Sequence, residues 1–125
     1  MNVLNNTKLW LIIVAIGHIV IGSGGTYAEQ GNEELAIIGF FLVVGIYLLY
    51  AAFMLEGQAQ ARLAAVLCGP MVVWFVLGAA MSLEMFGEAA VPLPESIVPI
   101  VLWGMPALSG VMGWNMDDAA PAAEA

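Results

Sequence analysis

Basic side chains are almost absent from this sequence. Lys8 and Arg62 are the only two, against ten acidic residues, so the formal net charge is −8 at pH 7. Proteins that bind nucleic acids neutralise phosphates with lysine and arginine. The shortage therefore excludes nucleic acid as a partner. It also leaves no polybasic segment that would hold anionic lipid headgroups.

Cysteine and histidine are equally scarce, with one of each, Cys68 and His18. A single cysteine excludes an internal disulfide and a multi-cysteine zinc site, and one histidine cannot build a multi-histidine metal centre. The patterns G-x-S-x-G, H-E-x-x-H and C-x-x-C and the phosphate-binding glycine loop are missing too. We therefore expect no enzyme active site within this chain alone, and the sequence names no cofactor.

Charged residues of either sign make up only 10% of the chain, whereas 62% of its residues are hydrophobic and the mean hydropathy is +0.96. A soluble domain carries about a quarter charged residues, which coat the surface that it cannot bury. Lipid removes that requirement. The chain is therefore predicted to be an integral protein of a cell membrane, and we expect the inner membrane of a bacterium or archaeon.

Four apolar stretches, separated by short polar breaks, cover residues 9–25, 35–55, 63–85 and 97–114. A helix needs roughly 20 residues to cross a hydrocarbon core of about 30 Å, and the second and third stretches meet this length comfortably. The predicted fold is an all-α bundle of four transmembrane helices. These helices form a single membrane domain over residues 1–116, and the acidic tail 117–125 is predicted to be disordered.

The two basic residues predict how the bundle is oriented. Lys8 precedes the first stretch and Arg62 lies in the link 56–62, whereas the loops 26–34 and 86–96 carry glutamates and no basic residue. The positive-inside rule then places the N-terminus and the C-terminus in the cytoplasm. An alternative is that residues 1–28 form a cleaved signal peptide ending Thr-Tyr-Ala, which would leave three spans.

His18 is the one ionisable side chain well inside a predicted span, on the helix face that carries small residues. An ionisable group in a membrane is a candidate proton relay, metal ligand or cofactor ligand. The alternative is a neutral imidazole bonded to a backbone carbonyl or hydroxyl of a neighbouring helix. Glu84 lies at a similar depth and would pair with His18 if it faces inward, whereas solvation at the interface is the usual outcome so near a helix end.

Small residues at four-residue spacing form the clearest pattern in the third and fourth stretches. Such surfaces let helix backbones approach closely in a membrane, either within the bundle or against another subunit. Trp74 and Trp103 fall near mid-span, away from the interfaces that tryptophan prefers, and are candidate partner contacts. The candidate helix-packing residues are Ala61, Ala65, Gly69, Gly78, Ser82, Ser109 and Gly113.

Met81 and Met85 are spaced as neighbours on one helix face. Thioethers suit Cu(I), which makes this pair a weak candidate metal site. Flexible methionine is also ordinary packing material, and neither histidine nor cysteine lies beside the pair. Whether the chain binds a metal is therefore left open.

The layout is similar to that of small four-helix bacterial membrane proteins of the DoxX-like kind, in span number and in the short link 56–62. This resemblance carries no shared motif and implies no activity. Our first hypothesis is an accessory or scaffold subunit of a larger membrane complex, packed against other membrane subunits or itself. The second is a small proton or cation transporter or channel that uses His18. The third is a membrane enzyme subunit that shares a cofactor site with a partner.

Overall fold

A computed structural model of the chain describes residues 2–116, so the predicted acidic tail lies outside the described residues. The described part is mostly helical. It also contains one antiparallel pair of short strands, β1 (Glu84–Met85) and β2 (Glu88–Ala89). The helical elements in chain order are η1 (Val3–Asn5), α1 (Thr7–Gly17), the π-helix η2 (His18–Gly25), α2 (Thr26–Gln30), η3 (Gly31–Glu34), α3 (Leu35–Phe53), α4 (Gly57–Ala80) and α5 (Ile97–Met112).

Helical backbone runs without a break from Thr7 to Phe53, a stretch of 47 residues. This stretch and Gly57–Ala80 are the two that are long and apolar enough to cross a membrane, and Ile97–Met112 is a shorter apolar helix of 16 residues. The structure thus shows three long helical stretches where four helices were predicted. The reason is that the expected loop 26–34 is itself helical, beginning with Thr26, whose hydroxyl donates to the Gly22 carbonyl at 2.6 Å.

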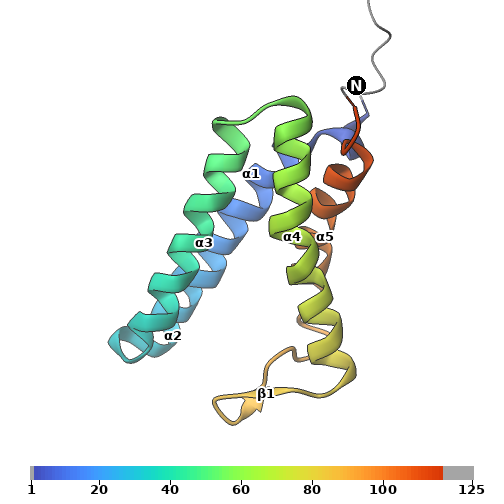
Figure 1. Cartoon of the computed structure of the whole chain (residues 1–125). Helices are drawn as coiled ribbons and strands as arrows, with labels where there is room; N and C mark the ends of the chain where they lie inside the picture. The colour runs from blue at the N-terminus through green and yellow to red at the C-terminus, as the bar shows by residue number, and fades with distance from the viewer. Residues whose placement is uncertain (1, 117–125) are drawn as a thin grey trace, which may run out of the picture.

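Gly31 reverses the first stretch. Its φ of +60° lies in the region that favours glycine, and the chain after it runs back along α1 as α3. Thr7–Phe53 therefore forms a first hairpin, and α4 with α5 forms a second (Figure 1). Helix α1 packs against both α3 and α5 and so joins the two hairpins.

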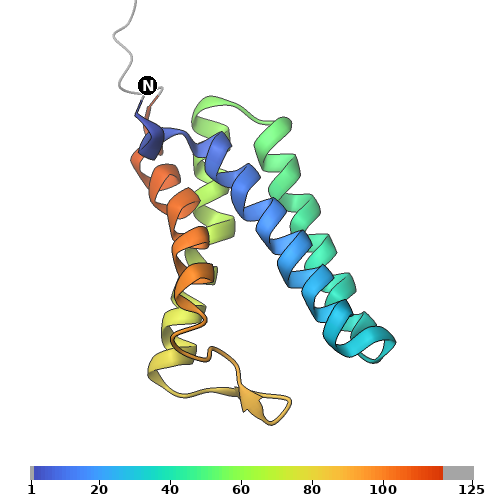
Figure 2. The ribbon, with the colours of Figure 1, turned by 180° about the vertical axis from the view of Figure 1, so that it is seen from behind.

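The two hairpins meet at one end of the molecule and diverge toward the other, as the opposite views in Figures 1 and 2 agree. We call the end that holds the link between α3 and α4 the closed end. The end that holds the Gly31 turn and the strands β1 and β2 is the open end. The N-terminus lies at the closed end.

At the closed end α4 and α5 are in backbone contact. A Cβ added to Gly110 would lie 2.5 Å from the Ala61 carbonyl oxygen and 2.7 Å from the Ala65 nitrogen. A Cβ on Gly113 would lie 2.9 Å from the Cβ of Ala61. Real side chains do not approach so closely, so only glycine in α5 at position 110 and directly after it at position 113 allows the observed packing.

The core lies beside this contact and is built from alanine, cysteine and a few larger side chains. Its buried members come from α1, α3, α4 and α5, so it ties the hairpins together. They are Leu11, Val14, Ala15, Leu48, Ala51, Ala52, Ala64, Cys68 and Trp103.

Gln60 closes the C-terminal end of α3 from its position in the first turn of α4. Its buried side-chain nitrogen donates to the carbonyl oxygens of Ala51 at 2.9 Å, Ala52 at 3.0 Å and Leu55 at 2.8 Å. The last carbonyls of a helix have no partner within the helix, and this amide satisfies two of them, those of Ala51 and Ala52, together with the Leu55 carbonyl just after α3.

The third helix is displaced from its predicted range 63–85, since α4 begins at Gly57 and ends at Ala80. The helix stops because Ser82 adopts a φ of +51° and the Leu83 nitrogen turns back to donate to the Gly78 carbonyl at 2.9 Å. Residues predicted to complete the helix instead enter the strand β1.

Candidate binding cavity

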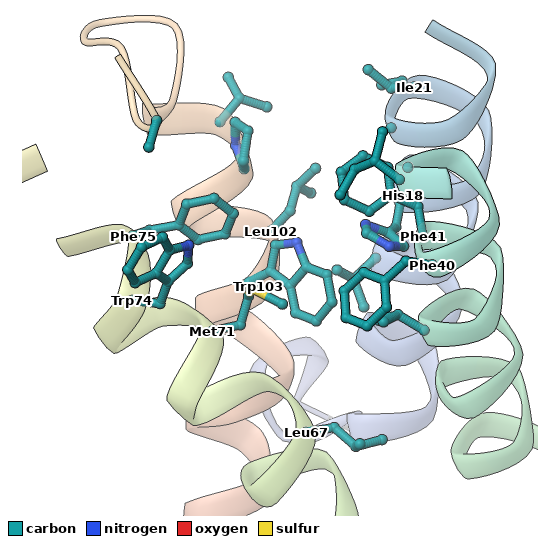
Figure 3. Close-up of a pocket in the computed structure, with 18 of the residues that line it drawn as sticks. His18, Ile21, Phe40, Phe41, Leu67, Met71, Trp74, Phe75, Leu102 and Trp103 are labelled. Atoms are coloured by element: carbon teal, nitrogen blue, oxygen red, sulfur yellow. The ribbon is translucent and has the colours of Figure 1, made fainter. Parts of the chain in front are cut away.

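A cavity of about 770 Å³ lies between the two hairpins, toward the open end (Figure 3). Its walls come from α1, η2, α3, α4, α5 and the segment that connects α4 to α5. Most of the lining is apolar, and the aromatic side chains in it are Phe40, Phe41, Trp74, Phe75 and Trp103. The cavity size falls within the range of about 300–1,000 Å³ that is usual for small-molecule sites.

The π-helix η2 shapes one wall of this cavity. It begins at His18 and ends at Gly25, and it contains three glycines and Ser23, residues with weak preference for the α-helix. π-Helical turns are rare overall, and many of those that occur lie at functional sites. The widened backbone therefore starts at the residue that the sequence marked as the main candidate.

His18 lies edge-on to two aromatic rings from opposite hairpins. Its ring centroid is 5.1 Å from that of Phe41, at an interplanar angle of 64°, and 5.2 Å from that of Trp103, at 85°. Figure 3 shows the imidazole pointing from the first hairpin toward Trp103 on the second. These edge-to-face contacts hold the imidazole at the wall of the cavity.

The Nε2 atom of His18 is buried and has no hydrogen-bond partner among residues 2–116. The backbone of Phe41 is near enough to interact electrostatically with the imidazole, but no bond of acceptable geometry reaches Nε2. A buried polar atom left unpaired costs about 1–3 kcal/mol. The Phe41 backbone is thus the group of a neighbouring helix that comes closest to satisfying the imidazole, the alternative predicted for His18, and Nε2 remains unpaired among residues 2–116.

Basic residues are far from this site. Lys8 lies over the Phe53 ring at 5.6 Å, and Arg62 stacks on Trp114 and donates from Nε to the Trp114 carbonyl at 3.0 Å. All four of these residues are at the closed end. Neither lysine nor arginine lines the cavity, and within residues 2–116 Glu95 is the one acidic residue that does.

The two predicted tryptophans line the cavity, whereas the predicted glutamate does not. Trp103, only 4% exposed, and Trp74, 45% exposed, both line the cavity. Glu84 lies exposed in β1 and is not brought to His18, because α4 ends before it. The carboxylate that reaches the cavity wall belongs to Glu95, which the sequence analysis did not single out.

The two methionines do not share a helix. Met81 is the exposed residue at the end of α4, and Met85 lies in β1, where it lines the cavity. The spacing of a helical pair is therefore lost. Within residues 2–116 there is also no group of three or more His, Cys, Asp and Glu side chains that would hold a metal ion.

The small residues divide between packed and open positions. Ala61, Ala65 and Gly113 lie in the contact of α4 with α5, and the Ser109 hydroxyl donates to the Pro106 carbonyl at 3.2 Å within α5. A Cβ on Gly78 would lie 2.6 Å from a methyl group of Val91, so this glycine packs against the connecting segment. Of the remaining two, Gly69 has open space beside it and Ser82 is exposed.

Several important residues escaped the sequence analysis, notably Phe41, Gln60 and Gly110. Phe41 and Gln60 act on residues of other helices, so spacing along one helix does not reveal them. The sequence next to His18 does contain one signal that points to open space beside the imidazole. Gly22 lies four residues later and leaves the space beside the imidazole open, since the position of a Cβ on it is 3.6 Å from Nδ1.

No protein family, curated protein or solved structure matches this chain. We therefore infer the function from the geometry of the chain itself. That geometry is a mostly helical chain with an apolar, aromatic-walled cavity and one buried, unpaired imidazole nitrogen.

Proposed function

We propose that this chain is a four-span membrane protein that holds an apolar, lipid-soluble molecule in the cavity between its two hairpins, without chemistry of its own. The observation that carries the proposal is the cavity of about 770 Å³ with apolar and aromatic walls. Ligand sites in helical bundles lie between helices and combine apolar walls with a few polar groups. His18 supplies the polar group here.

The membrane part of the proposal is supported by what the helices expose. Large apolar side chains point outward along their length, among them Ile46 at 62%, Val73 at 57% and Val101 at 54% exposed. Exposing such an apolar surface to water costs free energy, whereas exposing it to lipid does not. The four proposed spans are the arm α1–η2–α2, then α3, α4 and α5, of which α5 is the shortest.

The charges support one orientation of these spans. Lys8 and Arg62 are at the closed end, and the loops of the open end carry only glutamates among their charged residues. The closed end is then cytoplasmic, with both termini on that side, and the cavity lies in the opposite half of the membrane.

Cysteine accessibility tests the orientation. In a Cys68→Ala background, single cysteines at the exposed positions Asn32, Glu88 and Glu56 are treated in intact cells with a membrane-impermeant maleimide. We expect labelling at the first two positions and none at the third until the cells are opened. Equal labelling of all three in intact cells would refute the four-span topology.

Retention of an apolar probe tests the cavity. The chain in lipid nanodiscs is incubated with 1-bromo-4-decylbenzene and then weighed by native mass spectrometry, where the bromine isotope pair identifies bound probe. We expect one probe per chain in the wild type. Gly22→Leu should abolish retention, because Gly22 lines the cavity beside His18.

Gly24→Leu is the matched control. Gly24 belongs to the same π-helix but is exposed and does not line the cavity, so probe retention should persist. If both leucine variants retain the probe as the wild type does, the cavity is not the binding site and the proposal fails.

An accessory subunit is the second candidate, favoured by Trp74. This side chain is 45% exposed beside the cavity, where a partner helix would cover it. Against it, small residues that motivated the idea, such as Ala61 and Gly113, already pack within the chain. Extraction from native membranes and native mass measurement decides, because an accessory subunit should migrate with its partner and a monomer should not.

A transport path through His18 has less support. Toward the closed end the cavity is bounded by Val14 and Leu67, which adjoin the buried core at Leu11. Reconstituted vesicles with wild type and His18→Ala would nevertheless decide, since equal proton fluxes remove the idea.

A further inference from the structure

The chemistry of the cavity restricts the molecule that it takes, and this restriction rests on the proposed function above. We infer that the cavity binds an uncharged, lipid-soluble ring compound that carries a carbonyl oxygen, the chemistry of the quinone class. The carbonyl accepts a hydrogen bond from the imidazole of His18, and the ring lies among the aromatic side chains of the cavity.

The charges exclude anionic occupants first. Fatty acids and phospholipids bring a carboxylate or phosphate, which needs a cation or several donors when it is removed from water. Neither lysine nor arginine lines the cavity, and the charged residue that does, Glu95, would repel an anion. An uncharged molecule meets no such cost.

The unpaired imidazole requires a polar atom on that uncharged molecule. Nε2 is buried without a partner, so a plain hydrocarbon chain that filled the cavity would leave this deficit in place. A carbonyl oxygen removes it in the tautomer that carries the proton on Nε2, because this nitrogen is then a donor.

The space for that carbonyl lies beside Gly22. The Nδ1 and Cε1 atoms of His18 face this glycine, with 3.6 Å and 4.0 Å to the position that a Cβ would occupy. A half-turn of the imidazole about χ2 brings Nε2 to the same side. In that orientation Nε2 offers its proton where the missing side chain leaves room.

The aromatic walls favour a flat ring over a flexible chain. Phe41 and Trp103 already meet the imidazole edge-on, and Phe40, Trp74 and Phe75 add further aromatic surface to the same cavity (Figure 3). Aromatic rings gain from offset-stacked and edge-to-face contacts with another ring. Apart from His18 and Glu95, the rest of the lining is aliphatic or thioether, which suits the apolar tail of such a compound.

Native mass spectrometry with a matched pair of probes tests the inference. Decyl-ubiquinone has two ring carbonyls. Its fully methylated quinol, 1,2,3,4-tetramethoxy-5-decyl-6-methylbenzene, has the same ring substituents and tail but no carbonyl. We expect the wild type to prefer the quinone, and His18→Phe to weaken quinone binding by about tenfold while changing the methylated analogue less than about twofold.

Two further variants guard against a folding artefact. Gly22→Ala should also weaken the quinone selectively, because its Cβ occupies the carbonyl position at an ordinary contact distance from Nδ1. Tyr47→Phe removes a polar atom outside the cavity lining and should change neither affinity. The infrared carbonyl band of bound quinone should lie lower in wild type than in His18→Phe.

The outcomes separate this inference from the proposed function. If the wild type binds both probes equally, or His18→Phe weakens both equally, the carbonyl assignment is overturned while the cavity remains a binding site. If neither probe nor 1-bromo-4-decylbenzene is retained, the proposed function itself fails.

Discussion

The closed and open ends of this molecule use opposite packing strategies. At the closed end small residues bring helix backbones together, as at Gly110, where not even a Cβ fits against the Ala61 carbonyl. At the open end aromatic side chains such as Trp74 and Phe40 face a cavity in place of a packed neighbour. Helix α4 belongs to both ends and carries Pro70 between them, at the cavity wall.

The difference separates the tightly packed half of the molecule from the half that holds the cavity. The core residues nearest the closed end, such as Leu11, Leu48 and Ala51, are fully buried, so substitutions there have no room to relax. The cavity wall of the open end carries an unpaired imidazole nitrogen, a cost that a ligand would remove. Binding sites commonly retain such locally unfavourable features.

The largest effect is expected from Gly110→Ala, which breaks the closed end. The new Cβ would overlap backbone atoms of α4, which cannot move aside as a flexible side chain can. We expect a loss of about 3 kcal/mol in the free energy of unfolding, at the upper end of overpacking effects. The rate at which the buried Cys68 thiol is alkylated on heating reports the loss.

Gly104→Ala is the control for this prediction. It lies in the same helix, and a Cβ there meets nothing within 4 Å. Its effect should stay within about 0.5 kcal/mol or be slightly stabilising, because alanine favours helix. Equal alkylation rates in the two variants would show that the close approach of α4 and α5 is not needed for stability.

A smaller effect is expected from Gln60→Ala, which opens the link between the hairpins. Two carbonyls in the last turn of α3 and the Leu55 carbonyl after it lose their donor, and we expect a cost of about 2 kcal/mol. Gln58→Ala is matched to it, because the side-chain nitrogen of Gln58 is buried with no partner among the described residues. That variant should cost no stability and should gain up to about 1 kcal/mol, because it removes a buried, unpaired nitrogen. A similar cost in both variants would contradict the capping role.

The coarse fold was predictable from the sequence. Composition indicated an apolar membrane chain and the length of its apolar stretches indicated helices, and the structure shows two helices that are long and apolar enough to cross a membrane. The count of helices was less predictable, because the polar segment 26–34 looks like a loop. It continues the helix instead, through local hydrogen bonds such as that of Thr26, before Gly31 turns the chain.

The site was only partly predictable, because it depends on which residues of different helices lie opposite one another in the fold. His18 was identified because an ionisable residue within an apolar run is conspicuous by itself. Its partners Phe41 and Trp103 are ordinary apolar residues of α3 and α5, and nothing in their own neighbourhood marks them. Gly110 was missed for the same reason, since its importance depends on which residue of α4 lies opposite.

The smallest predicted effect concerns His18, at the open end of the molecule. His18→Phe keeps a ring between Phe41 and Trp103 and removes the buried, unpaired nitrogen, so the ligand-free protein should gain about 1 kcal/mol in the free energy of unfolding. His18→Ala, which also removes the ring contacts, should instead lose stability. Thermal unfolding monitored by Cys68 alkylation compares the two. A clear loss of stability in His18→Phe would mean that the nitrogen is paired in the folded protein, and the division between a packed closed end and an unsatisfied open end would fall.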